Sequence, residues 1–163
     1  RQLKSTLAIV FFLLIALSNP VSAQDGRMQM FTETTSPSGL SETVKKFKEE
    51  VTANGWSILN MTNMAGILSE RGFTVAPVLI FDVCSGKYSA AILSKDEFRF
   101  VTPIMPCRVS IYQTSTGKVV IGRMNAKAFA PMFEKELADV ILQSANDVDR
   151  IIEDVVKKLA AKK

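Results

Sequence analysis

The sequence predicts an α+β domain: a small, mostly antiparallel sheet with helices on one face, an N-terminal hydrophobic helix and a C-terminal amphipathic helix. Three observations lead to this class. Short apolar segments with strand-like patterns alternate with helical segments, a β-hairpin is expected around residues 108–124, and a long stretch of helical periodicity follows. This order favours helices packed on one face of an antiparallel sheet.

The first 23 residues have the pattern of a targeting segment. Arg1 and Lys4 precede an uninterrupted apolar run from Leu7 to Leu17, and Pro20 then leads to the small residues of Val21-Ser22-Ala23. We therefore expect residues 1–23 to be a signal peptide or an uncleaved membrane anchor. The protein would be exported to the periplasm, and anchored in the inner membrane if the leader is retained.

Residues 24–163 are predicted to form one domain, with a C-terminal helical extension from about residue 127. Period-2 apolar positions predict a strand at 27–32, and TTSPSG at 34–39 predicts a loop. Leu40, Val44, Phe47 and Val51 then recur at helical spacing until Asn54-Gly55, which favours a helix end.

In the middle of the chain, the sequence predicts strands at 56–61 and 75–83 and short helices at 63–71 and 85–94. Gly72 is expected to end the helix at 63–71. Alternation at 108–113 and 119–124 around a turn at 114–117 predicts the hairpin. Pro131 is expected to begin a long helix, with a kink or turn at Asn146-Asp147 between two apolar stripes. The uncovered sheet face suggests a homodimer or a neighbouring subunit.

Composition excludes several kinds of chemistry. The chain has no histidine, which rules out histidine triads, HExxH zinc sites and CxxCH haem attachment. The net charge is +4, but Arg1 and Lys4 lie in the leader, so we expect no nucleic-acid partner. No glycine-rich phosphate loop or nucleophile elbow is present, so the sequence predicts no reaction and no catalytic residue.

Two cysteines, Cys84 and Cys107, lie at the ends of predicted core strands. If these strands are neighbours, a disulfide is possible, and an oxidising compartment favours it. Two other interpretations stay open: two inert buried thiols, or a thiol pair used in redox or metal chemistry.

Cys84, Cys107 and nearby Met105 form the candidate metal set, because thiolate and thioether sulfur suit Cu(I). We therefore predict no cofactor, with copper or haem as the alternative. Asp82 is embedded in an apolar run, and Arg108 is its candidate partner in a structural ion pair if the two strands pair.

The central stretch resembles the domain-of-unknown-function 302 family. The resemblance is carried by Gly72-Phe73, Asp82-Val83-Cys84-Ser85-Gly86-Lys87, Pro106-Cys107-Arg108-Val109-Ser110-Ile111-Tyr112, and Gly117-Lys118-Val119 leading to Met124-Asn125-Ala126. It covers roughly residues 55–141. The family usually has Cys-Asn-Pro-Lys where this chain has Cys-Ser-Gly-Lys, and Asn-Pro where it has Asn125-Ala126. The resemblance implies a compact α+β domain that tends to dimerise, and it implies no activity.

Two functions remain in view. The first is an exported, membrane-tethered, non-catalytic accessory domain that binds itself or a membrane protein complex. The alternative is a periplasmic redox or metal-binding domain, for copper or haem, that uses Cys84, Cys107 and nearby methionines.

Overall fold

The computed structural model describes residues 30–162, so the predicted leader lies outside the described residues. Five strands form one antiparallel sheet in the order β1-β5-β4-β3-β2. Their bounds are β1 Phe31–Thr35, β2 Ser57–Asn63, β3 Val78–Cys84, β4 Cys107–Gln113 and β5 Val119–Met124. The predicted α+β class and the antiparallel sheet are confirmed.

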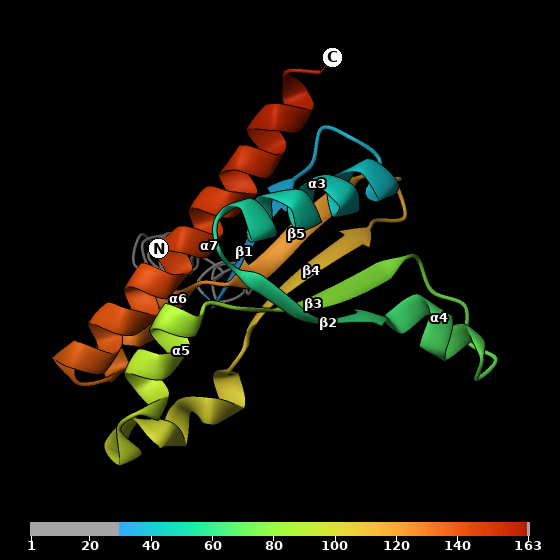
Figure 1. The fold of residues 1–163 in the computed structure, drawn as a ribbon. Helices are drawn as coiled ribbons and strands as arrows, with labels where there is room; N and C mark the ends of the chain where they lie inside the picture. The colour runs from blue at the N-terminus through green and yellow to red at the C-terminus, as the bar shows by residue number, and fades with distance from the viewer. Residues whose placement is uncertain (1–29, 163) are drawn as a thin grey trace, which may run out of the picture.

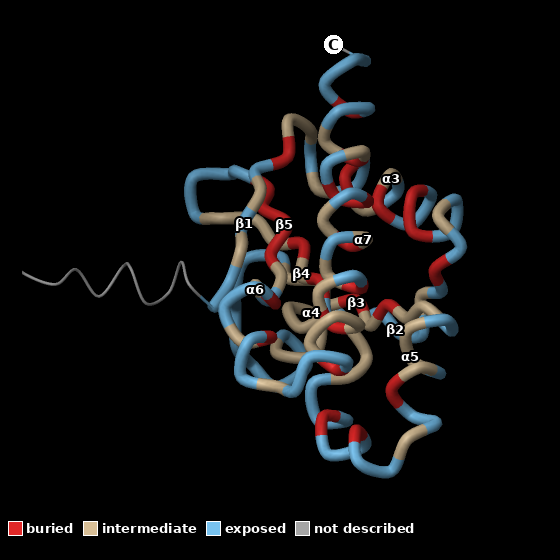
Figure 2. Tube along the Cα trace, turned by 90° about the vertical axis from the view of Figure 1, so that its left-hand side faces the viewer, coloured by how far each residue is buried: buried red, intermediate tan, exposed pale blue. Residues whose placement is uncertain are grey.

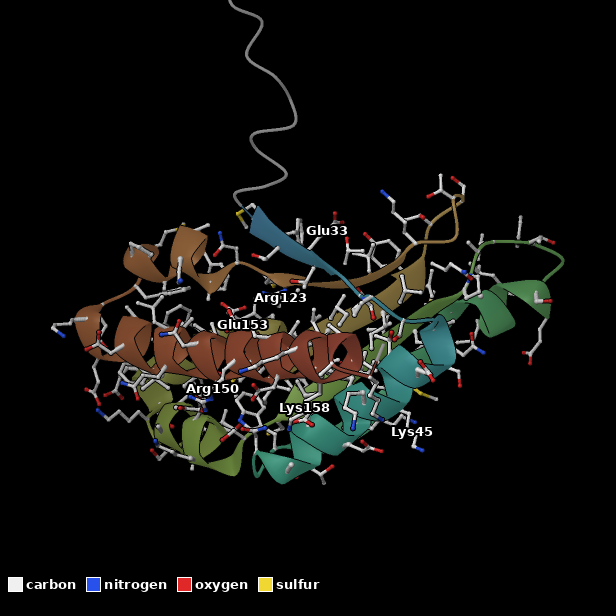
Figure 3. All side chains as sticks on the ribbon, turned by 90° about the horizontal axis from the view of Figure 1, so that it is seen from above. Glu33, Lys45, Arg123, Arg150, Glu153 and Lys158 are labelled. Atoms are coloured by element: carbon white, nitrogen blue, oxygen red, sulfur yellow. The ribbon has the colours of Figure 1, made fainter. Side chains whose placement is uncertain are left out.

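Helices α3 (Leu40–Ala53) and α7 (Lys135–Ala160) lie side by side on one face of the sheet, and α5 (Gly86–Leu93) lies at one end (Figure 1). The short helix α4 (Met64–Ser69) stands at the other end. The remaining helical segments are η1 Asp96–Ile104, α6 Ala126–Phe129 and η2 Ala130–Met132. Seen from above, α3 and α7 cover one face of the sheet, and no helix from residues 30–162 covers the other face (Figure 3).

Strand alternation explains which face is covered. Phe81, Val109, Ile111 and Ile121 occupy matching positions on neighbouring strands and are fully buried against the helices. Together with Phe47 and Val51 of α3 and the residues Val148, Ile151, Ile152, Val155 and Leu159 of α7, they belong to what we call the first core. Burial of this apolar surface is the main stabilisation of the sheet.

A second core lies beyond the end of the sheet. It consists of Ile92, Phe98, Val101, Ala126, Ala130, Leu137 and Ile141. Figure 2 shows buried positions recurring along α7, and they belong to both cores. The helix is continuous from Lys135 to Ala160, so the predicted kink at Asn146-Asp147 is wrong. The two apolar stripes of the sequence belong to one helix that packs against two different cores.

Three other local predictions need correction. Strand β1 extends to Thr35, into the predicted loop, because its residues pair with β5 up to Val120. Segment η1 is a 3-10 helix where no element is predicted; its buried residues Phe98 and Val101 have the three-residue spacing of that helix. Pro131 lies in η2 and does not begin the long helix, which starts four residues later with Glu134 as its N-cap.

Within residues 30–162, none of the helices combines enough length with enough apolar character to cross a bilayer.

Candidate functional site

A pocket of about 110 Å³ lies where the first core meets the second. We call it the thiol pocket. Its walls come from the facing ends of β3, β4 and β5, from α5, η1 and α6, and from the middle of α7. Its apolar lining includes Val83, Ile92, Val101, Ile104, Phe129, Ile141 and Val148, and its sulfur atoms come from Cys84, Met105, Cys107 and Met124. The volume is slightly below that of an engineered cavity of about 150 Å³ that binds benzene.

Neighbouring strands bring the two cysteines to this pocket. Cys84 is the last residue of β3 and Cys107 the first residue of β4. The Cys84 Sγ lies 3.0 Å from the Ser89 Oγ of α5, and the Cys107 Sγ lies 3.5 Å from the Ser144 Oγ of α7. Each thiol therefore has a hydroxyl partner on a different helix.

The predicted disulfide between Cys84 and Cys107 is not formed, and both cysteines are free thiols. The strand register explains this difference. Val83, not Cys84, lies opposite Cys107, so the two cysteines are displaced by one residue along the strands. The sequence pattern put each cysteine at the end of a predicted strand but could not set a register that depends on single residues.

Burial raises the pKa of the Cys107 thiol, and the hydrogen bond with Ser144 offsets part of this effect. A negative charge on Cys84 would raise it further. A thiol with a raised pKa carries little thiolate at neutral pH and is therefore a weak nucleophile.

An ion pair joins the sheet to α7 at the pocket wall. The Arg123 Nε of β5 donates to Asp149 Oδ1 of α7 at 2.5 Å, and its Nη1 donates to Thr34 Oγ1 at 3.0 Å. Arg123 is 9% exposed and Asp149 is 35% exposed. Figure 3 shows Arg123 on the side of the sheet that faces α7. This ion pair therefore occupies the carboxylate of Asp149 and links β5 to α7 at the pocket wall.

The candidate pair Asp82 and Arg108 lies on the other face of the sheet. The two residues are opposite each other in the β3–β4 register, and the Arg108 Nε donates to Asp82 Oδ1 at 3.0 Å. Arg108 is 72% exposed, whereas Asp82 is 18% exposed. This exposure gives the pair a small effect on stability. Arg108 also belongs to the lining of the thiol pocket.

Sequence reasoning missed four polar residues of the pocket: Ser89, Ser144, Arg123 and Asp149. Two signals were present. Ser144 continues the helical spacing of Leu137 and Ile141, so it is a polar residue on a buried stripe. Arg123 follows Val119 and Ile121 on the core-facing side of its strand.

The only tryptophan of the chain, Trp56, also lines the pocket. Its ring lies 6.0 Å from that of Tyr88, whose hydroxyl donates to Asp147 of α7. This hydrogen bond raises the pKa of Tyr88. Trp56 is 4% exposed, so its fluorescence reports on the pocket from inside the fold.

The described residues, 30–162, offer few side chains that could bind a metal ion together. No group of three or more cysteine, aspartate, glutamate or histidine side chains gathers there in a way that could hold an ion. The only sulfur ligands at the candidate site are therefore the two thiols and the methionines beside them. Cys84, Cys107 and Met105, the predicted set, all line the thiol pocket.

The fold and this site define a small α+β domain with helices on one sheet face and a thiol-lined pocket at one end of the sheet. The chain belongs to the family described as "Domain of unknown function DUF302", whose model matches residues 32–159. The resemblance seen in the sequence is confirmed.

A solved structure has the same fold: the uncharacterized conserved protein DUF302 from Bacillus stearothermophilus. It superposes with a TM-score of 0.69 at 21% identity, over 77% of this chain and 97% of that chain. No curated protein matches the sequence.

Proposed function

We propose that the protein is an exported, non-catalytic domain that binds a small ligand in the thiol pocket. One observation carries this proposal: two free thiols from adjacent strands line the same concave, mostly apolar space. Most binding sites combine apolar walls with a few convergent polar groups, as this pocket does. Export rests on the targeting pattern of residues 1–23, with membrane tethering if the leader stays attached.

Binding is favoured over turnover because the groups around the thiols are not arranged for proton transfer. The chain has no histidine, and the carboxylate of Asp149 at the pocket wall is engaged by Arg123. Efficient acid–base catalysis needs a group that is free to take the proton. The small volume also favours an ion or a small molecule over a haem.

Thiol accessibility tests this function. Methyl methanethiosulfonate adds only a methylthio group to a thiol, so it should enter the pocket and modify Cys84 and Cys107 in the native, reduced protein. A maleimide carrying a polymer chain should react with them only after unfolding. The reference is Ser115→Cys in a chain that lacks both native cysteines, because Ser115 is an exposed residue of the β4–β5 turn. This reference thiol should react with both reagents.

Trp56 emission gives a second readout, since modification inside the pocket should change it and modification at residue 115 should not. If neither native thiol reacts with the small reagent until the protein unfolds, the pocket is closed and the proposal is wrong. Equal reactivity with the small and the bulky reagent would also contradict it, because the thiols would then lie on an open surface.

A second candidate function is contact through the uncovered sheet face, either with a second copy or with a membrane protein complex. The observation in its favour is apolar exposure on that face: Phe31 and its register partner Met124 are 52% and 39% exposed. Sedimentation over a range of concentrations tests it, with Phe31→Ser expected to weaken any self-association. A monomer at every concentration, with no partner recovered from detergent-solubilised membranes, would exclude this function.

A further inference from the structure

The thiol pocket gathers soft ligands from three points of the chain. Cys84 ends β3, Cys107 begins β4, and Met105 lies between η1 and β4. Thiolate and thioether sulfur select soft ions, of which Cu(I) is the common biological example. We propose that the pocket is a Cu(I) site in which Cys84 and Cys107 bind the ion as thiolates and Met105 completes it. This inference rests on the proposed ligand-binding function.

The ligand set separates Cu(I) from other metals. A structural zinc ion takes four ligands from cysteine, histidine or carboxylate side chains. The chain has no histidine and two cysteines, and the carboxylate of Asp149 at the pocket wall is paired with Arg123. Calcium and magnesium require several oxygen ligands, which a mostly apolar pocket does not supply. Cu(I) is satisfied by two or three sulfur atoms.

The side chains around the two thiols also favour a Cu(I) ion. Ser89 and Ser144 lie within hydrogen-bond distance of Cys84 and Cys107. Once a metal displaces the thiol protons, each hydroxyl can donate to a thiolate and orient it. The apolar walls limit the access of water and of oxidants to the bound ion.

The experiment uses the reduced domain titrated with Cu(I) in the absence of oxygen, against bicinchoninate as a coloured competing chelator. We expect one Cu(I) per chain, a change in Trp56 emission that saturates at the same ratio, and an X-ray absorption spectrum with only sulfur in the first shell. Cys84→Ser and Cys107→Ser should each lose the stoichiometric binding. Ser144→Ala keeps all three ligands and should weaken binding by about 10- to 100-fold, as orienting partners of metal ligands do.

Methionine variants provide the matched comparison. Met105→Leu should lower the affinity and remove one sulfur scatterer from the spectrum, while both thiols remain. Met132→Leu should change nothing, because Met132 is 82% exposed and does not line the pocket. Circular dichroism establishes that each variant is folded, and the Met105 variant keeps the test decisive if a cysteine variant fails to fold.

Two results would overturn the inference. One is uptake of Cu(I) that is unchanged when both cysteines are replaced. The other is loss of all copper to bicinchoninate while methyl methanethiosulfonate still modifies both thiols. In the second case the pocket binds another ligand and the proposed function stands. If the thiols are also unreactive toward the small reagent, both proposals fail together.

Discussion

The ion pair at the pocket wall predicts unequal costs for removing its two partners. Asp149→Ala leaves the Arg123 guanidinium, on a side chain only 9% exposed, with Thr34 as its remaining partner. Removing one member of a fully buried pair costs about 3–5 kcal/mol. Because Asp149 is 35% exposed, water reaches the site, and we expect about 2 kcal/mol for this variant.

Arg123→Met should cost less, about 1 kcal/mol. It removes the buried charge, keeps most of the apolar stem, and leaves Asp149 partly solvated. The double variant should match Arg123→Met within about 0.5 kcal/mol, since no unpaired buried charge remains. Lys135→Ala is the control on the same helix: its pair with Asp139 is exposed, so the loss should stay below about 0.5 kcal/mol.

Urea unfolding at pH 7, followed by Trp56 fluorescence and by circular dichroism, measures these free energies. Coincident transitions from the two signals justify a two-state treatment. A larger loss for Arg123→Met than for Asp149→Ala would refute the reasoning, because the stabilisation would then come from contacts of the arginine and not from compensation of its charge.

Three further predictions concern the pocket thiol, the uncovered face and the second core. Because burial raises the pKa of Cys107, its alkylation by iodoacetamide should be slower at pH 8 than that of a cysteine at position 115, with a rate midpoint above the ordinary thiol value of about 8.5. Because folding raises the pKa of Cys107, this thiol adds to the free energy of unfolding at pH values below its pKa in the unfolded chain. That contribution is lost as the pH rises through the pKa of the folded protein. Gly122→Ala places a Cβ 2.8 Å from Ser110 Oγ and should cost about 1–3 kcal/mol, most of it recovered when Ser110 is changed to glycine as well. Leu137→Ala, at a fully buried position, should cost about 2–5 kcal/mol in thermal or urea unfolding.

Each of these has a clear contrary result. Alkylation of Cys107 at the rate of the reference thiol would mean that burial does not hold the thiol neutral. If the double variant at positions 122 and 110 is as unstable as Gly122→Ala alone, the added Cβ does not clash with Ser110. A loss below about 1 kcal/mol for Leu137→Ala would mean that the second core repacks around the gap.

The order of strands and helices could be predicted because apolar periodicity is local. The hairpin strand at 119–124 and the helix starting at Leu40 match their observed bounds closely, since the turn at Gly117 and Asn54-Gly55 fix their ends. The continuity of α7 could not be predicted. Asn146 and Asp147 have low helix propensity, and packing of the helix against both cores overrides it.

Only some of the residues that line the thiol pocket could be predicted from the sequence, for a related reason. Cys84, Cys107 and Met105 were candidates because of their residue type, and the strand pattern put each cysteine at the end of a predicted strand. Their partners Ser89 and Ser144 come from helices whose positions depend on tertiary packing. The same dependence explains why no disulfide joins the two cysteines, since Val83 and not Cys84 lies opposite Cys107 in the strand register.

The pairing of β1 with β5 has a consequence for how the chain is made. Strand β1 emerges from the ribosome about ninety residues before its partner β5, and α7, which covers the sheet together with α3, follows both. The helical cover of the sheet therefore cannot be complete until α7 has been synthesised. A chain that ends before Lys135 would have α3 on the sheet but lack α7, so this truncated protein should aggregate or be degraded.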